Sequence, residues 1–273
     1  GYDDLGELKS FIEKEVSKGA AGASSQEIPD VDFSLIFDHS VPNAVEYLSL
    51  DSISEEVYRL FTLHCLTDSV ATGMATEYLR YTLLPRILAL TKTASRVLFS
   101  CMVALADVHP RSIVDALVLP LAHAPHDADE HAAPRKEIIH RLVADHVPVD
   151  MEAALLRGVL AGPESPGAEG GHEGVGGIGN TVVHPLSPPS VAALKALLAK
   201  KSLPWTHADV RALAVRAQAS HSLYRKDSKF AALLFTIISR FPEECGECKD
   251  ILRAALLQCE TAMAKSALRK LDR

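Results

Sequence analysis

The chain has 273 residues, of which 48% are hydrophobic, 23% charged and 5% aromatic, a balance that is typical of a folded protein and excludes disorder along its whole length. Its formal charge of −7 argues against binding to a nucleic-acid backbone as the main activity, because such binding needs a basic surface that releases counterions. No stretch approaches the roughly 20 apolar residues of a membrane-spanning helix, so neither direct nucleic-acid binding nor a membrane is expected.

Polar caps and prolines mark the starts of successive helices along the chain. Ser52 with Glu55, and Thr206 with Asp209, have the spacing of a capping box. Other residues expected to open helices are Pro110, Pro134, Asp150, Pro188, Pro189, Asp227 and Pro242. The helices expected from these signals and from apolar periodicity are 5–18, 57–63, 72–90, 94–106, 112–119, 137–143, 151–160, 191–200, 210–215, 229–239 and a segment from 242 to near 259.

The same pattern predicts an all-α fold. No run of alternating apolar and polar residues is bounded by Asn-Gly or Asp-Gly, the signal that a β-hairpin would leave. Successive amphipathic helices on short turns favour an α-solenoid of antiparallel helical hairpins, of the HEAT or armadillo type, because each pair must bury its apolar face against the next. A compact helical bundle is the alternative.

Two polar stretches define the expected domain organisation. Residues 1–30 are expected to form an N-terminal helix and a linker, and residues 31–273 a helical-repeat domain. Within that domain, the segment 162–189 is rich in Gly, Pro, Ser and His and has almost no apolar side chain to bury, which predicts a flexible surface insertion that tolerates deletion.

Candidate cofactor motifs are present, but their context is wrong. Residues 174–179 match the dinucleotide fingerprint G-x-G-x-x-G, yet no strand precedes them and no helix can follow. Cys245 and Cys248 have the spacing of a zinc or redox pair, and Cys259 follows, but no second pair completes a four-ligand site. The five cysteines make no disulfide framework, which favours a reducing compartment, the cytosol or the nucleus.

Three histidines lie with acidic residues in a loop between two expected helices, where a polar loop is favoured over a metal site. No Gly-x-Ser-x-Gly elbow is present either. We therefore expect a binding protein without catalytic residues, metal or other cofactor. The three histidines are His123, His126 and His131.

Two segments carry a family resemblance. Residues 85–98 (Pro-Arg-Ile-Leu-Ala-Leu-Thr-Lys-Thr-Ala-Ser-Arg-Val-Leu) and 230–239 (Phe-Ala-Ala-Leu-Leu-Phe-Thr-Ile-Ile-Ser), followed by Lys-Ser-Ala-Leu at 265–268, resemble the C-terminal domain of the Fanconi anaemia complementation group E family. The likeness runs from about Ser52 to Leu271 in the same order and spacing, apart from an insertion at 162–184.

That resemblance implies an elongated stack of helical hairpins with no active site of its own. In the family, the domain joins the group C subunit to the other subunits of the nuclear core complex. It also presents the group D substrate for monoubiquitination during interstrand-crosslink repair. The resemblance therefore implies an adaptor in the nucleus, with the cytoplasm as a second location.

Arg86 is the first candidate for partner binding, because it is a charged group in an otherwise apolar stretch and arginine is enriched at interface hot spots. A helix-end arginine with a buried stem is the alternative interpretation. Arg96, which closes the Ala-Ser-Arg element of the resemblance, is the second candidate.

The last helix is the expected docking site for the substrate. The family uses an exposed apolar side chain there, with basic residues beside it, but its aromatic position falls on Ala262 in this sequence. The remaining candidates are Met263, Lys265 and Arg269. A basic stripe formed by Lys265, Arg269 and Arg273 also suits a solvent-exposed face that complements the helix dipole.

Two other functions fit the same composition. A helical-repeat scaffold of the HEAT or armadillo type with unrelated partners shares every compositional feature, and differs only in lacking the two motif segments. A helical hydrolase or metal enzyme is the second alternative, and it predicts a bound metal or a deep polar pocket.

Overall fold

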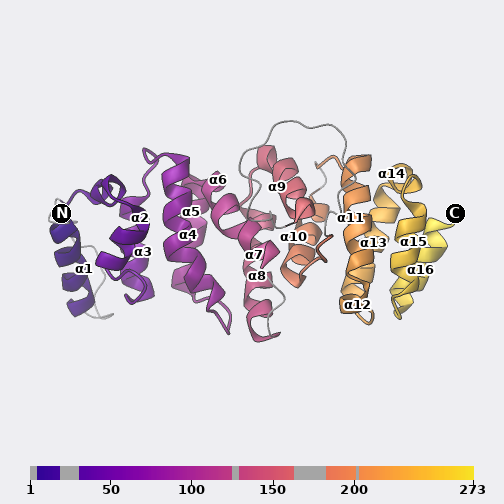
Figure 1. Ribbon diagram of the computed structural model, residues 1–273, viewed down its shortest axis with the longest axis horizontal. Coiled ribbons are helices and arrows are strands. Elements are labelled where there is room, and N and C mark those ends of the chain that lie inside the picture. The colour runs from indigo at the N-terminus through magenta and orange to yellow at the C-terminus, as the bar shows by residue number, and fades with distance from the viewer. Residues whose placement is uncertain (1–4, 19–30, 125–128, 163–182, 201–202) are drawn as a thin grey trace. The chain divides into compact units, whose positions relative to one another are not determined.

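The computed structural model describes residues 5–18, 31–124, 129–162, 183–200 and 203–273. All regular structure in these ranges is helical, and none of these residues lies in a strand (Figure 1), which confirms the all-α prediction. The chain divides into two compact units, the first formed by residues 1–118, 128–138 and 145–147, the second by 119–127, 139–144 and 148–273. No helix in the described ranges has the length and hydropathy that a membrane span requires.

In the first unit, several helices pack on the helix two places along the chain: α2 contacts α4, α3 contacts α5, and α4 contacts α6. Helix α4 also contacts the π-helical turn η3. The helix α8 (Asp129–Asp145) contributes residues to both units. The other helices of the first unit are α1 (Gly6–Lys18), η2 (Phe33–Asp38), α2 (Val41–Tyr47), α3 (Glu55–Cys65), α4 (Thr72–Leu88), α5 (Arg96–Val108), α6 (Pro110–Ile113) and η3 (Val114–Val118).

In the second unit, α9 contacts α7, α10 and α11, and α13 and α16 form the most extensive pair. α11 also packs on α15, and α10 on α13. The helices of this unit are α7 (Leu119–His123), α9 (Val149–Ala161), α10 (Pro188–Ala199), α11 (His207–Ala219), α12 (His221–Tyr224), α13 (Ser228–Arg240), α14 (Pro242–Gly246), α15 (Lys249–Leu257) and α16 (Ala262–Leu271).

Local capping signals predict some helix starts correctly. Thr206 and Asp209 form the expected capping box, in which each side chain accepts a hydrogen bond from the other residue's backbone amide. The Asp227 carboxylate accepts from the amide of Lys229 at 2.6 Å, as expected of an N-cap. These signals succeed because both partners lie within one turn of helix.

The capping box expected at Ser52 is wrong. The Ser52 hydroxyl donates to the carbonyl of Ser49 at 2.8 Å, inside a tight turn where Ser49 has a φ of 52°. Ser54 caps α3 instead, accepting a hydrogen bond from the amide of Val57. The turn that precedes the helix thus moves the cap by two residues.

Three other boundaries also differ from the sequence prediction. Pro134 lies inside α8, because that helix already begins at Asp129. Asp150 lies in the first turn of α9, where its charge suits the helix dipole, and Pro148 is the N-cap. The segment expected from 242 to near 259 is two helices, α14 and α15, which are separated by Glu247 and Cys248.

The first helix belongs to the core of the first unit. Leu8, Phe11 and Ile12 of α1 are buried, and the ring centroid of Phe11 lies 5.3 Å from that of Phe33 in η2. The helix is therefore packed against the body rather than held apart from it. The expected linker at 20–30 lies outside the described residues.

Part of the expected insertion is packed structure. Leu186 is fully buried, and its amide donates to the Ser220 hydroxyl at 2.7 Å. The Ser187 hydroxyl donates to the carbonyl of Ala122, and Pro188 and Pro189 form the first turn of α10. The last residues of the segment predicted as an insertion, from Leu186 to Pro189, are therefore packed against the second unit. The G-x-G-x-x-G motif at 174–179 lies outside the described residues.

Arginine side chains bind carbonyl groups near helix ends. Arg135, only 6% exposed, donates to the carbonyl of Leu88, the last residue of α4, at 2.8 Å. In the second unit, Arg240 donates to the carbonyl of Leu198 near the end of α10. Such carbonyls have no partner within their own helix, so the guanidinium groups satisfy them and tie neighbouring helices together.

Arg216 does the same at the base of the insertion. Its guanidinium donates to Val159 near the end of α9 and to the carbonyls of His184 and Pro185, at 3.0 and 3.2 Å, just before α10. One buried side chain thus holds the two segments between which residues 163–182 lie.

A ladder of buried hydroxyl groups joins α3 to α4. The Thr82 hydroxyl donates to the Tyr78 carbonyl at 2.8 Å, so its oxygen is left to accept from the Tyr58 hydroxyl at 2.9 Å. The Tyr78 hydroxyl lies 3.0 Å from the hydroxyl of Thr62. Each of these groups is buried, and each contact fixes the register of the two helices.

We predict that Thr82→Val destabilises the protein more than Tyr58→Phe. The valine has the shape of threonine but leaves the Tyr58 hydroxyl buried without its acceptor, at a cost of about 1–3 kcal/mol. Tyr58→Phe removes the donor while Thr82 keeps its bond to the Tyr78 carbonyl, so about 1 kcal/mol is expected. Urea unfolding measures both, and the double variant should cost less than the two single costs combined. Strict additivity would contradict the ladder.

Candidate partner-binding surfaces

Arg86 lies in the last turn of α4, and its side chain makes contacts within the first unit. Its guanidinium donates to the carbonyls of Leu50 and of Ile53, the latter at 3.1 Å, and lies 4.4 Å from the ring centroid of Tyr58. The side chain therefore holds the turn between α2 and α3 onto α4. Of the two interpretations of Arg86, these contacts favour the structural one.

Arg96 is the exposed candidate of the first unit. It is the first residue of α5, whose N-cap Ser95 accepts a hydrogen bond from the amide of Leu98 at 3.0 Å. The cap fixes the helix start, and the Arg96 side chain is left at the surface. Its charge is therefore available to a partner.

The last helix exposes its three candidate residues. Ala264, Ala267 and Leu271 of α16 are buried, on the side of the helix that packs on α13. By the helical period, Lys265 and Arg269 share a face with Ala262, whereas Met263 lies on the opposite flank. The Met263 side chain is 38% exposed, but it does not lie beside Lys265 and Arg269 of the expected basic stripe.

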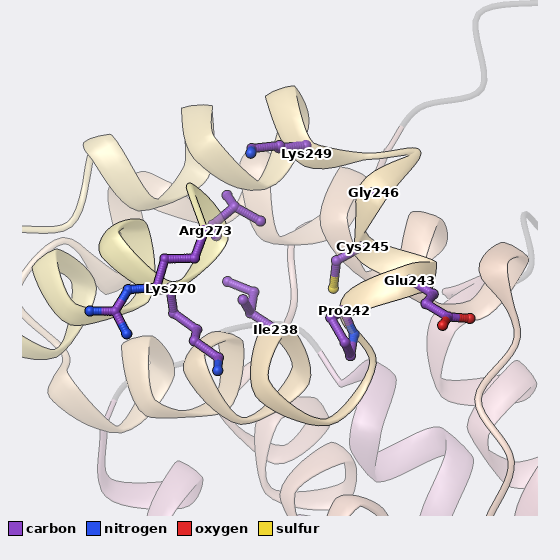
Figure 2. Close-up of a pocket in the computed structure, with 9 residues that line it drawn as sticks. Ile238, Pro242, Glu243, Cys245, Gly246, Lys249, Lys270 and Arg273 are labelled. Carbon is purple, nitrogen blue, oxygen red and sulfur yellow. The ribbon is translucent and has the colours of Figure 1, made fainter.

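The ends of four helices enclose a pocket of about 390 Å³ at the C-terminal end of α16. Its lining combines three cationic side chains and one carboxylate with an apolar floor. Figure 2 shows Glu243 on one side of the pocket and Lys270 and Arg273 on the other. The lining residues are Ile238, Pro242, Glu243, Cys245, Gly246, Lys249, Lys270, Leu271 and Arg273.

The cysteines are buried thiols. All five are free and buried, and burial raises the pKa of Cys245 to about 12 and that of Cys248 above its ordinary value. A protonated thiol is neither a nucleophile nor a good metal ligand at neutral pH. Among the described residues, no three Cys, His, Asp or Glu side chains are placed to hold a metal ion.

The histidines of the polar loop do not form a described cluster. His123 ends α7 and belongs to the second unit. His131 of α8 belongs to the first unit, where its Nδ1 atom hydrogen-bonds to the carbonyl of Leu90. His126 lies outside the described residues. Burial, and then the nearby Arg216, lower the pKa of His123 below its ordinary value of 6.5.

No protein-family model matches the chain, and no curated protein shows significant similarity to it.

We predict that Arg86→Glu lowers the free energy of unfolding by about 2 kcal/mol or more, because it leaves two carbonyls of the α2–α3 turn without their donor. Arg96→Glu makes the same charge change at an exposed site and should shift stability by only about 0.5 kcal/mol. Thermal unfolding of both variants measures the difference. Equal stability would make Arg86 a free surface residue.

The lowered pKa of His123 predicts a loss of stability in mild acid. The unfolded chain takes up a proton at the ordinary pKa of 6.5, whereas the folded protein resists it, so stability falls as the pH drops through 6.5. His123→Leu should have a shallower dependence of unfolding free energy on pH over this range than the parent chain. Parallel pH profiles would contradict the assignment.

Proposed function

We propose that this chain is a non-enzymatic adaptor whose helices present separate surfaces to different proteins. On the sequence resemblance, its partners are the Fanconi group C subunit and other core-complex subunits. It would also present the group D substrate for monoubiquitination in interstrand-crosslink repair, in the nucleus. The proposal rests on the resemblance of residues 85–98, 230–239 and 265–268, in that order, to that family.

The helix packing supports the architecture that the proposal needs. In the first unit α2 contacts α4, α3 contacts α5 and α4 contacts α6, and in the second α9 contacts α11. Contacts between alternate helices are expected where antiparallel hairpins stack as repeats. We therefore propose that the helices of each unit are HEAT- or armadillo-like hairpins.

Much of the resemblance falls on residues that build the fold. Residues 230–239 lie in α13, where six side chains are buried, and residues 85–98 contain the Arg86 guanidinium contacts and the Ser95 cap. Partner contacts must instead come from exposed side chains. Those that the resemblance indicates are Arg96, Met263, Lys265 and Arg269.

An adaptor of this kind works by tethering. Two proteins held on one scaffold meet at an effective concentration that reaches about millimolar, so a weak bimolecular encounter becomes an intramolecular one. The proposed role requires two independent surfaces and no proton transfer. Arg96 belongs to the first unit and α16 to the second, so each surface can be altered alone.

Co-elution with purified group C protein from the same source tests the proposal. We expect a stable one-to-one complex of micromolar affinity or better in size-exclusion chromatography. Arg96→Glu should weaken it by about tenfold, since a charge is reversed at a proposed contact. Lys195→Glu, at an exposed position of α10, is the control with the same charge change. If both proteins are folded and do not co-elute, a helical scaffold with unrelated partners becomes the better description.

Docking of the group D substrate is tested by a gain of affinity. Ala262 is exposed on α16 and shares a face with Lys265 and Arg269, so Ala262→Phe would supply the aromatic side chain that the family carries there. We expect tighter substrate binding, by about thirtyfold, because a buried aromatic anchor contributes about 2 kcal/mol. Ala262→Ser is the control for the position. No gain with the phenylalanine would remove α16 as the docking helix.

A further inference from the structure

The pocket of the second unit carries cations that have no partner inside it. Lys249 comes from the start of α15, Lys270 from the last turn of α16, and Arg273 lies two residues after that helix ends at Leu271. None of the three side chains forms an ion pair or side-chain hydrogen bond with any described residue. Their charges therefore remain available to a ligand.

The single carboxylate in the lining does not neutralise them. Figure 2 shows the Glu243 side chain pointing to the side of the pocket away from Lys270 and Arg273. Three cationic side chains and one carboxylate give the lining a net positive charge, whereas the chain as a whole has a formal charge of −7.

The floor of the pocket is apolar. Ile238 and Leu271 are buried core residues that line it from α13 and α16. Cys245 also lines it, and burial raises the pKa of its thiol to about 12, so this side chain is uncharged. An apolar group of a ligand can therefore contact the floor while anionic groups meet the cations.

The shape of the site favours a peptide over a compact anion. In Figure 2 the amine of Lys249 and the amine of Lys270 lie on opposite sides of the pocket, so the cations do not converge on one point. A volume of about 390 Å³ accommodates a side chain and its neighbours. Several carboxylates spread along a chain match this arrangement better than a single phosphate does.

We propose that this pocket docks a short acidic peptide segment of another protein. One apolar side chain of the peptide lies against Ile238 and Leu271, and its flanking carboxylates pair with Lys249, Lys270 and Arg273. The inference rests on the lining of the pocket alone, and it holds whether or not the adaptor binds the group C subunit.

Fluorescence anisotropy with a labelled peptide tests the site. The probe has one leucine flanked on each side by two glutamates, with glycines at its ends. Lys270→Glu/Arg273→Glu should weaken its binding by about tenfold or more, since two attractive contacts become repulsive. Lys226→Glu/Lys229→Glu changes the same charge at exposed positions at the other end of α13 and should leave binding unchanged. An equal loss in both double variants would reduce the effect to net charge and overturn the proposal.

A steric variant tests the pocket without changing its charge. A Cβ atom built on Gly246, which lines the pocket, meets no atom within 4 Å, and the residue is helical, so the backbone accepts a side chain at this position. Gly246→Phe should fill the pocket and weaken binding of the peptide by about tenfold, while the thermal stability of the protein stays unchanged. Undiminished binding by this folded variant would place the peptide elsewhere.

Changes in the probe identify the ligand chemistry. Replacing its glutamates with glutamine, or its leucine with serine, should each weaken binding, because the first removes the charges and the second the apolar contact. Full binding of either altered peptide would overturn the proposal. Displacement of the peptide by inorganic phosphate at equal ionic strength, with sodium chloride as the control, would show a compact-anion site and overturn it as well.

Discussion

Unpaired carbonyl groups at helix ends are the constraint on which this structure depends. The last turn of every helix leaves carbonyls without an intrahelical partner, and a fold built from short helices has many such ends. In the described parts of the chain these groups receive arginine side chains from other helices, each acting within one unit. One guanidinium can serve several carbonyls because its donors form a rigid fork. The residues with this role are Arg135, Arg216 and Arg240, and Arg86 binds carbonyls of the turn between α2 and α3 in the same way.

This constraint explains which elements could be predicted from the sequence. The cap at Asp227 and the box at Thr206 depend on residues within one turn, so local pattern is sufficient. The cap at Ser54 depends on how the preceding turn packs, and the contacts of Arg86 join residues that are 36 and 33 positions apart in the sequence. An arginine in an apolar stretch reads as an interface residue when its distant acceptors are unknown. The same pattern therefore indicates two roles, and only the fold separates them.

The candidate sites differ in the same way. The exposed face of α16 could be predicted, because the period of its alanines and leucine indicates which side is buried. The cationic pocket could not, since it draws Lys249, Lys270 and Glu243 from the ends of separate helices. Nothing in the sequence pattern singles out Lys249 or Glu243. Such a site exists only once α13 to α16 have packed together.

Whether the residues that carry the family resemblance are buried or exposed determines whether the resemblance bears on the fold or on partner binding. Any stack of helical hairpins needs apolar positions like those of α13 and caps like Ser95, so agreement at such positions bears on architecture more than on partners. Partner choice depends on exposed side chains, because specificity is a difference in affinity between competing ligands. The exposed candidates on this chain are an arginine on α5 and the basic face of α16. The pocket at the end of α16 has a lining of net positive charge, opposite in sign to the charge of the whole chain. On the proposed function, partner choice therefore depends on these few exposed positions, and substitutions there are expected to alter binding while the helical core stays intact.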